Sequence, residues 1–302
     1  MKTALVTGAS GLLGFYLCPL LREDFKVYTL QRRDADVECD LAVSVPNLGG
    51  RTFNLVVHAA GSTAEDNALD VNLEGTRRLL QSLESYSPSE FVYISSWEVY
   101  SPDAGENVEE SEHLWASSKC GQSKALAEKL LTEWCDKHGV RLTVIRPARM
   151  LGKGVKGEMA QLFSDVVEGR YIHVRGNDAR LSLVCASDVA YAVKQLHSIG
   201  GVYNITDGRG ASWLELADAM SANFGQIKRH TFIPSKWVAI AWRLASWLYP
   251  VKASLDPAVL ARRSKSLTLS DSAVRSAIGD AWKPYPTLDV LAHKCQDYPY
   301  VD

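Results

Sequence analysis

The sequence has no apolar run of the roughly eighteen residues that a membrane-spanning helix needs. The nearest approach, residues 237–249, is interrupted by Arg243 and followed by Pro250. An excess of one charge is also missing, because 33 Lys and Arg residues are balanced by 35 Asp and Glu residues, for a net charge of −2. A chain so close to neutral has no overall attraction for nucleic acid or for an anionic membrane. We therefore expect no nucleic-acid partner and no transmembrane segment, and a ligand must be recognised by local groups.

Paired cysteines and metal-ligand spacings are absent as well. The six Cys residues form no CxxC pair, and the seven His residues lack spacings such as HxxxH. The first residues, MKTALVTGAS, contain no long apolar core of the kind that a signal peptide carries. These absences argue against a disulfide-stabilised secreted protein and against a metal site. They predict a protein of the reducing cytoplasm.

What the sequence does contain is a strict alternation of short, β-branched apolar runs with amphipathic stretches. The predicted strands are 3–7, 26–30, 55–58, 91–94 and 142–145, and the predicted helices between them are 12–22, 71–86 and 118–137. Alternating strands and helices imply right-handed βαβ crossovers. We therefore predict an α/β protein with a Rossmann-type, doubly wound parallel sheet that is covered on both faces.

From about residue 147 the alternation loosens. The predicted helices 158–168, 187–197, 213–224, 235–249 and 271–278 are separated by loops and by a few short strands such as 172–174 and 202–205. We predict a dinucleotide-binding domain over residues 1–147 and a smaller, mostly helical substrate-binding lobe over 148–302, with segments that return to the sheet. The lobe should close a cleft at the carboxyl edge of the sheet, where open α/β sheets bind ligands.

The first predicted strand runs into a glycine-rich loop, TGASGLLG over residues 7–14, that opens the first helix. Gly8 permits a tight turn, Gly11 lets the backbone approach a pyrophosphate, and Gly14 allows close helix packing. The N-terminus of the helix adds a positive dipole end. The loop therefore predicts dinucleotide binding, with a plain structural turn as the alternative. The residues expected to contact the dinucleotide here are Gly8, Ser10, Gly11, Leu12, Leu13 and Gly14.

The end of the second strand bears on the choice of cofactor. It reads Leu30-Gln31-Arg32-Arg33, without the carboxylate that would bind a ribose 2′-hydroxyl. Two guanidinium groups can clamp a 2′-phosphate, so Arg32 and Arg33 favour NADP, with NAD as the alternative. If they bind no cofactor, both are solvated loop residues beside Asp34 and Asp36.

Further motifs are spread over nearly the whole chain. They are Asp40-Leu41, His58-Ala59-Ala60-Gly61, Asn72–Thr76, Tyr93–Tyr100, Cys120–Glu128, Arg146–Gly152 and Arg180–Ala190. Together with the glycine-rich loop they resemble the extended short-chain dehydrogenase/reductase family, in its branch of NAD(P)-dependent nucleotide-sugar epimerases, dehydratases and ketoreductases. The resemblance implies that Asp40 and Leu41 contact the adenine. It also implies that Ala59, Ala60 and Gly61 belong to the cofactor site.

The family's catalysis uses a Ser or Thr, a Tyr and a Lys, with the Tyr and Lys four residues apart on one helix face. The Lys lowers the pKa of the Tyr and holds the nicotinamide ribose, the phenol exchanges a proton with the substrate, and the Ser hydroxyl fixes the substrate oxygen. The resemblance assigns the Ser position to Ser96 and the Lys position to Lys124. Cys120 stands where the Tyr is expected.

The cysteine leaves three interpretations open. The protein is an enzyme whose proton passes through Cys120, a water molecule or the substrate itself; or it binds a cofactor and ligand without catalysis; or Cys120 is only a small packed residue. We expect Lys124 and an oxidised nicotinamide to lower the pKa of the thiol below its reference value of about 8.5. The resulting thiolate would be a poor acid for carbonyl reduction.

In the family layout, cations at positions 149, 153, 156 and 180 would border the substrate cleft. A nucleotide sugar presents a pyrophosphate, and Arg180 is the expected bidentate partner, with a plain surface charge as the alternative. The predicted substrate site comprises Ser96, Trp97, Arg149 and Arg180. Asp188 should cap the helix that follows Ser187.

A Trp-rich helix predicted over 237–249 carries Trp237, Trp242 and Trp247. Core packing or a homodimer contact is one interpretation, and association with a membrane surface is the other. The function predicted for the whole chain is atypical NADP(H)-dependent nucleotide-sugar 4-ketoreduction or C4 epimerisation. The alternatives are a catalytically degenerate ligand-binding or sensing protein, and a ketone reductase with an apolar cleft for a non-sugar substrate.

Overall fold

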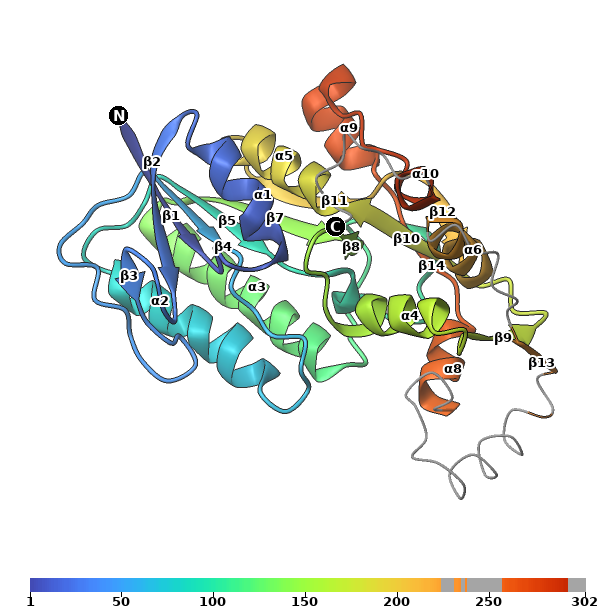
Figure 1. Ribbon diagram of the computed structural model, residues 1–302. Helices are drawn as coiled ribbons and strands as arrows, with labels where there is room; N and C mark the ends of the chain where they lie inside the picture. The colour runs from blue at the N-terminus through green and yellow to red at the C-terminus, as the bar shows by residue number, and fades with distance from the viewer. Residues whose placement is uncertain (224–230, 235–236, 238–256, 293–302) are drawn as a thin grey trace.

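The computed structural model describes residues 1–223, 231–234, 237 and 257–292, and Figure 1 shows their arrangement. Seven parallel strands form the main sheet in the order β11-β7-β5-β4-β1-β2-β3. Their bounds are β1 Lys2–Thr7, β2 Phe25–Gln31, β3 Val37–Glu38, β4 Leu55–His58, β5 Glu90–Ile94, β7 Arg141–Pro147 and β11 Gly201–Ile205. The chain starts in the middle of the sheet, builds one half and returns to build the other. The strand order therefore reverses between β1 and β4, which confirms the predicted doubly wound sheet.

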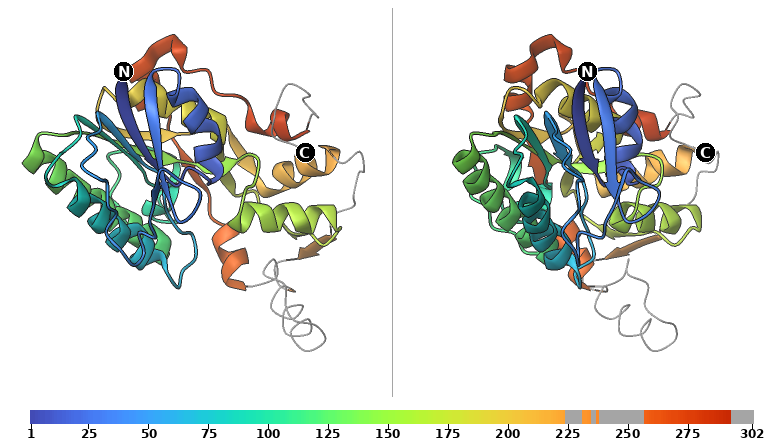
Figure 2. Two further views of the ribbon diagram at one scale, coloured as in Figure 1. Left: turned by 60° about the vertical axis from the view of Figure 1, so that its left-hand side comes forward. Right: turned by 90° about the vertical axis from the view of Figure 1, so that its left-hand side faces the viewer.

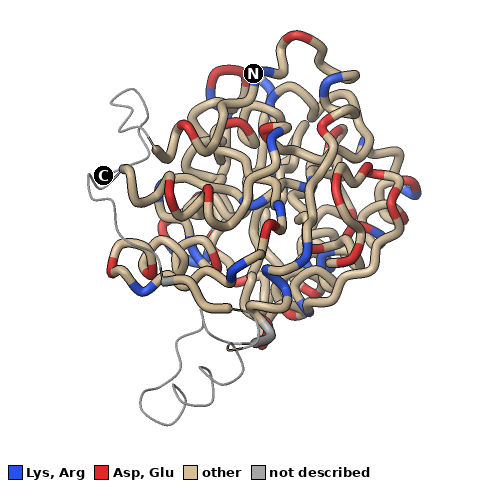
Figure 3. The backbone as a smooth tube through the Cα atoms, turned by 90° about the vertical axis from the view of Figure 1, so that its right-hand side faces the viewer, with Lys and Arg blue, Asp and Glu red and all other residues tan. Residues whose placement is uncertain are grey.

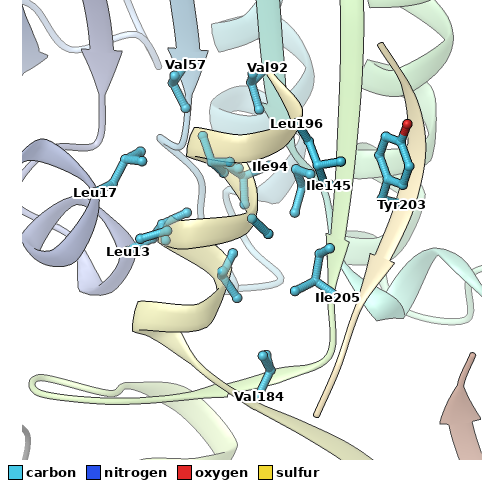
Figure 4. Packing of buried hydrophobic residues seen from close by; sticks show 14 of the residues in the cluster. Leu13, Leu17, Val57, Val92, Ile94, Ile145, Val184, Leu196, Tyr203 and Ile205 are labelled. Atoms are coloured by element: carbon cyan, nitrogen blue, oxygen red, sulfur yellow. The ribbon is translucent and has the colours of Figure 1, made fainter. Parts of the chain in front are cut away.

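The two faces of the sheet pack against different helices. Helices α1 (Leu12–Leu21) and α5 (Ala186–Leu196) cover one face, while η1 (Leu69–Glu74), α2 (Gly75–Leu83) and α3 (Lys119–His138) cover the other (Figure 1). Alternate residues of β1 enter the two cores, because strand side chains point to opposite faces. Figure 4 shows the first core, where Leu13 and Leu17 of α1 pack with Leu196 of α5 and with Val57 and Val92 of the sheet.

Two elements that follow residue 147 in the sequence pack with the Rossmann-type half of the molecule: one is a strand of the main sheet and the other is a helix on its face. Strand β11 pairs with β7 over Gly201–Ile205, and α5 packs along α1. Helix α9 (Ser272–Ile278), followed by the short turn η4 (Gly279–Ala281), lies against α5 and β11. All of these elements thus pack in or against the main sheet.

The remaining lobe is built on a second sheet. Its strands run in the order β12-β10-β14-β6, and β8 pairs with β10. Their bounds are β6 Gly105–Val108, β8 Arg149–Leu151, β10 Arg180–Cys185, β12 Gly210–Ser212 and β14 Leu267–Leu269. A separate parallel pair joins β9 (Ile172–Arg175) to β13 (Thr231–Pro234), and the lobe helices are α4 (Gly157–Val167), α6 (Trp213–Asn223), α8 (Pro257–Arg263) and α10 (Thr287–Ala292). The lobe is thus less purely helical than predicted, because strands of three to six residues carry too little periodicity to be recognised.

The lobe lies at the carboxyl edge of the main sheet, where β7 continues into β8 after a single residue (Figure 2). Basic and acidic residues are interspersed over the side drawn in Figure 3. Within the described ranges, no helix is both long and apolar enough to cross a bilayer. Of the predicted Trp-rich helix only Trp237 is described, so both interpretations of that helix fall outside the described residues.

Candidate cofactor and substrate site

The glycine-rich loop lies where β1 ends, against the end of β4. Gly8 adopts a left-handed conformation with φ of 69°, and a Cβ there would lie 2.7 Å from the nitrogen of Ala60. A Cβ on Gly14 would lie 2.4 Å from the carbonyl oxygen of Ala9. Both positions therefore require glycine, and the loop is held tightly between α1 and the segment after β4.

The start of α1 fits the phosphates of a dinucleotide. Gly11 is the N-cap residue, no side chain caps the helix, and its first turn contains no acidic residue. The amides of Leu12 and Leu13 are therefore available to an anion at the positive end of the helix dipole. A dinucleotide pyrophosphate matches this arrangement in both charge and hydrogen bonding.

Gln31, at the end of β2, links this loop to the arginine segment. Its Oε1 accepts a hydrogen bond of 2.9 Å from the amide of Ser10, and its Nε2 donates to the carbonyl oxygens of Arg33 and Asp34. Arg32 and Arg33 are exposed, and neither forms an ion pair within the described part of the chain. Gln31 is absent from the predicted site, although its place at a carboxyl strand end was a usable signal.

Asp40 and Leu41 lie beside the start of α2. Asp40 is exposed, and its Oδ1 accepts a hydrogen bond of 3.0 Å from the amide of Ala42. Leu41 is buried next to Gly75, and its carbonyl oxygen accepts a 2.9 Å hydrogen bond from Arg78 Nη1. Their contact with an adenine stays a prediction.

Beneath the loop, a buried chain of hydrogen bonds joins β1, β4 and η1. His58 contacts Thr7 Oγ1 through Nδ1 at 2.7 Å and Thr76 Oγ1 through Nε2 at 3.0 Å. Because Thr76 donates its own proton to the carbonyl of Asn72, it accepts from Nε2–H, and Nδ1 accepts from Thr7. Burial lowers the pKa of His58 to about 3, so the ring is neutral and serves to hold the strand ends in place.

Ser96 follows β5 and begins the short 3-10 turn η2 (Trp97–Val99). Its Oγ accepts a hydrogen bond of 3.1 Å from the amide of Glu98, which leaves the hydroxyl proton available for donation. The turn packs directly on the first turn of α3, since a Cβ on Gly121 would lie 2.1 Å from the carbonyl oxygen of Glu98. Ser118 caps α3 and donates to Glu98 Oε2 at 2.7 Å. The predicted Ser96 is therefore held beside the helix that carries Cys120 and Lys124.

Lys124 lies under the carboxyl ends of β4 and β5. Its Nζ donates a 2.8 Å hydrogen bond to the carbonyl oxygen of Ile94, and a Cβ on Gly61 would lie 2.9 Å from that nitrogen. Burial lowers the pKa of the ammonium to about 8, and the nearby carboxylates of Glu128 and Glu98 oppose this decrease. The amine can thus take up or release a proton near neutral pH.

Cys120 is buried, with 2% of its surface exposed, and its Sγ donates to the carbonyl oxygen of Ser62 at 3.5 Å. Burial raises the pKa of the thiol to about 12, Glu98 adds to the increase, and Lys124 opposes it. The part of the prediction that rests on Lys124 is therefore wrong, because loss of hydration outweighs the attraction of one nearby ammonium. The residue is a neutral thiol at physiological pH.

A buried polar network supports the helix from behind. Arg146 binds both carboxylate oxygens of Glu128, at 3.1 and 2.7 Å, and donates to the Tyr100 hydroxyl at 2.8 Å. Tyr100 in turn donates to Asn204 Oδ1 at 2.8 Å, and Ser95 donates to Glu128. The phenol of Tyr100 is therefore engaged in the network by both donation and acceptance.

On the substrate side, Arg149 lies between two indole rings. Its Cζ is 3.6 Å from the centroid of Trp97 and 5.4 Å from that of Trp213. Its Nε lies 3.6 Å from Glu158 Oε2, and Arg263 donates to the other oxygen of Glu158 at 3.2 Å. The structure thus joins two predicted substrate residues, Trp97 and Arg149, to partners on α4, α6 and α8 that sequence reasoning missed, since nothing local marked them.

Arg180 is engaged differently. Its guanidinium donates to the carbonyl oxygen of Gly210 and lies 4.0 Å from Glu215 Oε2, with 43% of the side chain exposed. Its role toward a diphosphate stays a prediction. Asp188 does not cap α5: the N-cap residue is Cys185, and Asp188 Oδ2 accepts a 2.9 Å hydrogen bond from the amide of Tyr285. That prediction is wrong because the backbone of a distant segment occupies the carboxylate.

Residues 4–206 match the family described as the NAD dependent epimerase/dehydratase family, which is about two thirds of the chain. This chain belongs to that family. Within the described residues, no cluster of three or more His, Cys, Asp or Glu side chains could hold a metal ion.

Two curated relatives illustrate the range of the family. The chain is 26% identical over 224 residues to the N-acetyl-alpha-D-glucosaminyl-diphospho-ditrans,octacis-undecaprenol 4-epimerase of Escherichia coli O157:H7, covering 67% of this chain and 66% of the relative. It is 28% identical over 245 residues to the GDP-6-deoxy-D-mannose reductase of Pseudomonas aeruginosa, covering 74% and 80%.

Solved structures of other proteins superimpose on nearly the whole chain. RMD from Pseudomonas aeruginosa, complexed with NADPH, superimposes with a TM-score of 0.73 at 23% identity and 97% coverage of both chains. MoeE5 in complex with UDP-glucose and NAD superimposes with a TM-score of 0.71 at 20% identity and 92% coverage of both chains. At these identities the similarity establishes the fold.

Proposed function

We propose that this family member binds NADP(H) and acts on a nucleotide sugar, by reducing a 4-keto group or by epimerisation at C4. The observation that carries the proposal is the common position of the glycine-rich loop, Ser96 and Lys124 at the carboxyl edge of one sheet. The relatives named as an epimerase and a reductase support the substrate class. Structural neighbours complexed with NADPH or NAD support the cofactor class.

The roles of the residues follow from their positions. A bound nicotinamide dinucleotide would supply or accept the hydride. The amides of Leu12 and Leu13 would bind its pyrophosphate, and Arg32 and Arg33 would bind a 2′-phosphate. Ser96 would donate its hydroxyl proton to the reacting substrate oxygen, since its Oγ already accepts a hydrogen bond within η2.

The proton would travel by an unusual route. A thiol with a pKa of about 12 is a poor proton donor, and Cys120 ends well short of the position that a phenol oxygen would reach. The amine of Lys124, with a pKa of about 8, is better matched to proton transfer near neutral pH. We propose that Lys124 exchanges the proton, directly or through a water molecule, in addition to holding the ribose.

A second candidate function is binding of the dinucleotide and a ligand without turnover. The observation that favours it is the neutral, buried thiol of Cys120 at the position expected for the proton donor. In that case the glycine-rich loop and Lys124 would keep their binding roles. The protein would then catalyse no reaction of the bound ligand.

Binding and turnover separate the two candidates. Titration calorimetry with NADPH and NADH measures cofactor affinity, and loss of nicotinamide absorbance after adding a 4-keto nucleotide sugar measures turnover. Binding with consumption of NADPH supports the enzyme. Binding with no consumption, across uridine, guanosine and thymidine sugars, supports the ligand-binding protein. Failure to bind either dinucleotide contradicts both.

A further inference from the structure

A cationic cluster lies beside Trp97, the residue after Ser96. It contains two guanidinium groups, Arg149 and Arg263, that share the single carboxylate of Glu158. Arg149 stacks on Trp97 at 3.6 Å, and Arg263 lies over Trp213 at 4.6 Å. The cluster therefore carries one more positive charge than negative charge in a largely dehydrated place.

The hydrogen-bonding capacity of Arg149 is only partly used. Its Nε is buried and has no partner within hydrogen-bond geometry among the described residues, although Glu158 lies close enough to form an ion pair. Glu98, the other carboxylate near this guanidinium, is hydrogen-bonded to Ser118. A buried charge with unmade hydrogen bonds is costly, and the burial of Arg149 lowers its pKa despite Glu158. An anionic ligand would supply an acceptor for the unpaired Nε.

The position indicates which part of a substrate would meet this guanidinium. Trp97 directly follows Ser96, so Arg149 stacks on the residue next to the one expected to hold the reacting oxygen. That is the sugar end of a nucleotide sugar. The guanidinium of Arg180 is a poorer candidate for the same ligand, because it is already engaged by Gly210 and Glu215.

Building on the proposed function, we infer that Arg149 is a specificity-determining residue that binds a carboxylate on the sugar ring and selects acidic nucleotide sugars over neutral ones. The planar guanidinium, held in place by the Trp97 ring, can bind both oxygens of a carboxylate. Glu158 competes for the same charge and therefore limits the affinity. The diphosphate of the substrate is a second source of anionic oxygens, and the experiment separates the two sources.

The test uses ligands that differ only in the group at issue. Calorimetric titration of the NADPH-saturated protein compares UDP-glucuronic acid, UDP-glucose and UDP alone. We expect UDP-glucuronic acid to bind about tenfold or more tighter than UDP-glucose, as a charge-assisted bidentate contact allows. The same acidic and neutral sugars linked to guanosine and thymidine diphosphates are compared as well, so that the result does not depend on the base.

The variants should change the preference for UDP-glucuronic acid over UDP-glucose in different directions. Arg149→Met should bring the ratio of the two affinities close to one while UDP and UDP-glucose bind as before. Arg149→Lys should keep only part of the preference. Glu158→Gln should increase it, because the competing carboxylate is gone. Arg209→Met, which removes an exposed arginine that pairs with Asp289 in the same lobe, should leave the ratio unchanged. Thermal unfolding and circular dichroism verify that each variant is folded.

Three results would overturn the inference. One is equal affinity for the acidic and neutral sugars in the unmodified protein. Another is a parallel loss of affinity for UDP, UDP-glucose and UDP-glucuronic acid in Arg149→Met, which would assign the residue to the diphosphate. The third is a weaker preference in folded Glu158→Gln. Absence of binding by every nucleotide sugar, with NADPH still bound, would instead contradict the proposed function on which the inference rests.

Discussion

The Nζ of Lys124 donates a 2.8 Å hydrogen bond to the carbonyl oxygen of Ile94, at the end of β5 and two residues before Ser96. This bond anchors a buried ammonium beneath the edge of the sheet where substrate and cofactor would meet. Cys120, one helical turn earlier, stays a neutral thiol and offers no full negative charge at neutral pH. The positive charge of Lys124 is therefore only partly balanced by negative charge nearby.

The first prediction concerns pH and Lys124. Burial lowers its pKa from 10.5 to about 8, so the native state releases this proton before the unfolded chain does. The stability contributed by this residue should therefore rise as pH increases from about 8 to about 10.5. The unfolding free energies of the unmodified protein and of Lys124→Met are measured with urea across that range. The difference between them should change by about 3 kcal/mol. Parallel curves would show that the amine titrates normally.

The second prediction concerns the missing phenol. Cys120→Tyr should raise or create 4-ketoreductase activity by about a hundredfold, the usual scale for a positioned proton donor. The matched control is Cys120→Phe, which adds the ring without an acidic proton and should give no increase. The measurement is the initial rate of NADPH consumption. No gain in Cys120→Tyr, with NADPH still bound, would indicate a lobe that does not hold such substrates.

The third prediction concerns the choice between dinucleotides. Replacing Arg32 and Arg33 with alanine should weaken NADPH binding by about ten- to thirtyfold, because each lost charge pair at these exposed positions costs about 1 kcal/mol. NADH, which lacks the 2′-phosphate, should bind as before. Arg22→Ala, at the far end of α1, is the control. Equal or tighter binding of NADH by the unmodified protein would contradict the arginine clamp.

The fourth prediction concerns Asp188. Burial raises the pKa of its carboxyl to about 7, the hydrogen bond from the Tyr285 amide opposes this, and nearby Asp207 adds to it. The native state therefore binds a proton that the unfolded chain releases near pH 4, so stability should fall as pH rises from about 4 to about 7. Asp188→Asn keeps an acceptor for the Tyr285 amide. The substitution should reduce the change in unfolding free energy between about pH 4 and pH 7 by a few kcal/mol. Unchanged slopes in urea unfolding would contradict the shift.

The main sheet could be predicted because its signals are local. Strand β4 has the predicted bounds Leu55–His58, and α3 differs from the predicted helix by one residue at each end. Ser118, at the predicted start of that helix, is its N-cap and accepts a hydrogen bond from the Gly121 amide at 2.9 Å. Apolar periodicity and capping chemistry both lie within one element, so a reader of the sequence has all the information needed.

The lobe sheet could not be predicted in the same way. Asn107 of β6 donates its amide to Thr268 Oγ1 of β14 at 2.8 Å, although the two residues are 161 positions apart. Strands this short are stabilised by the neighbours that they find in three dimensions. The partners of Arg149 on α4, α6 and α8 were hidden for the same reason.

The sequence by itself determined the glycine-rich loop, the pair Ser96 and Lys124, and the cysteine at the position expected for a tyrosine. These are properties of residue type and spacing. Only the tertiary structure decided that burial raises the pKa of Cys120 to about 12 and lowers that of Lys124 to about 8, and that Arg149 stacks on Trp97 while Arg180 binds Gly210. Hydration and electrostatic environment depend on groups brought together from distant parts of the chain, and no local pattern encodes that burial.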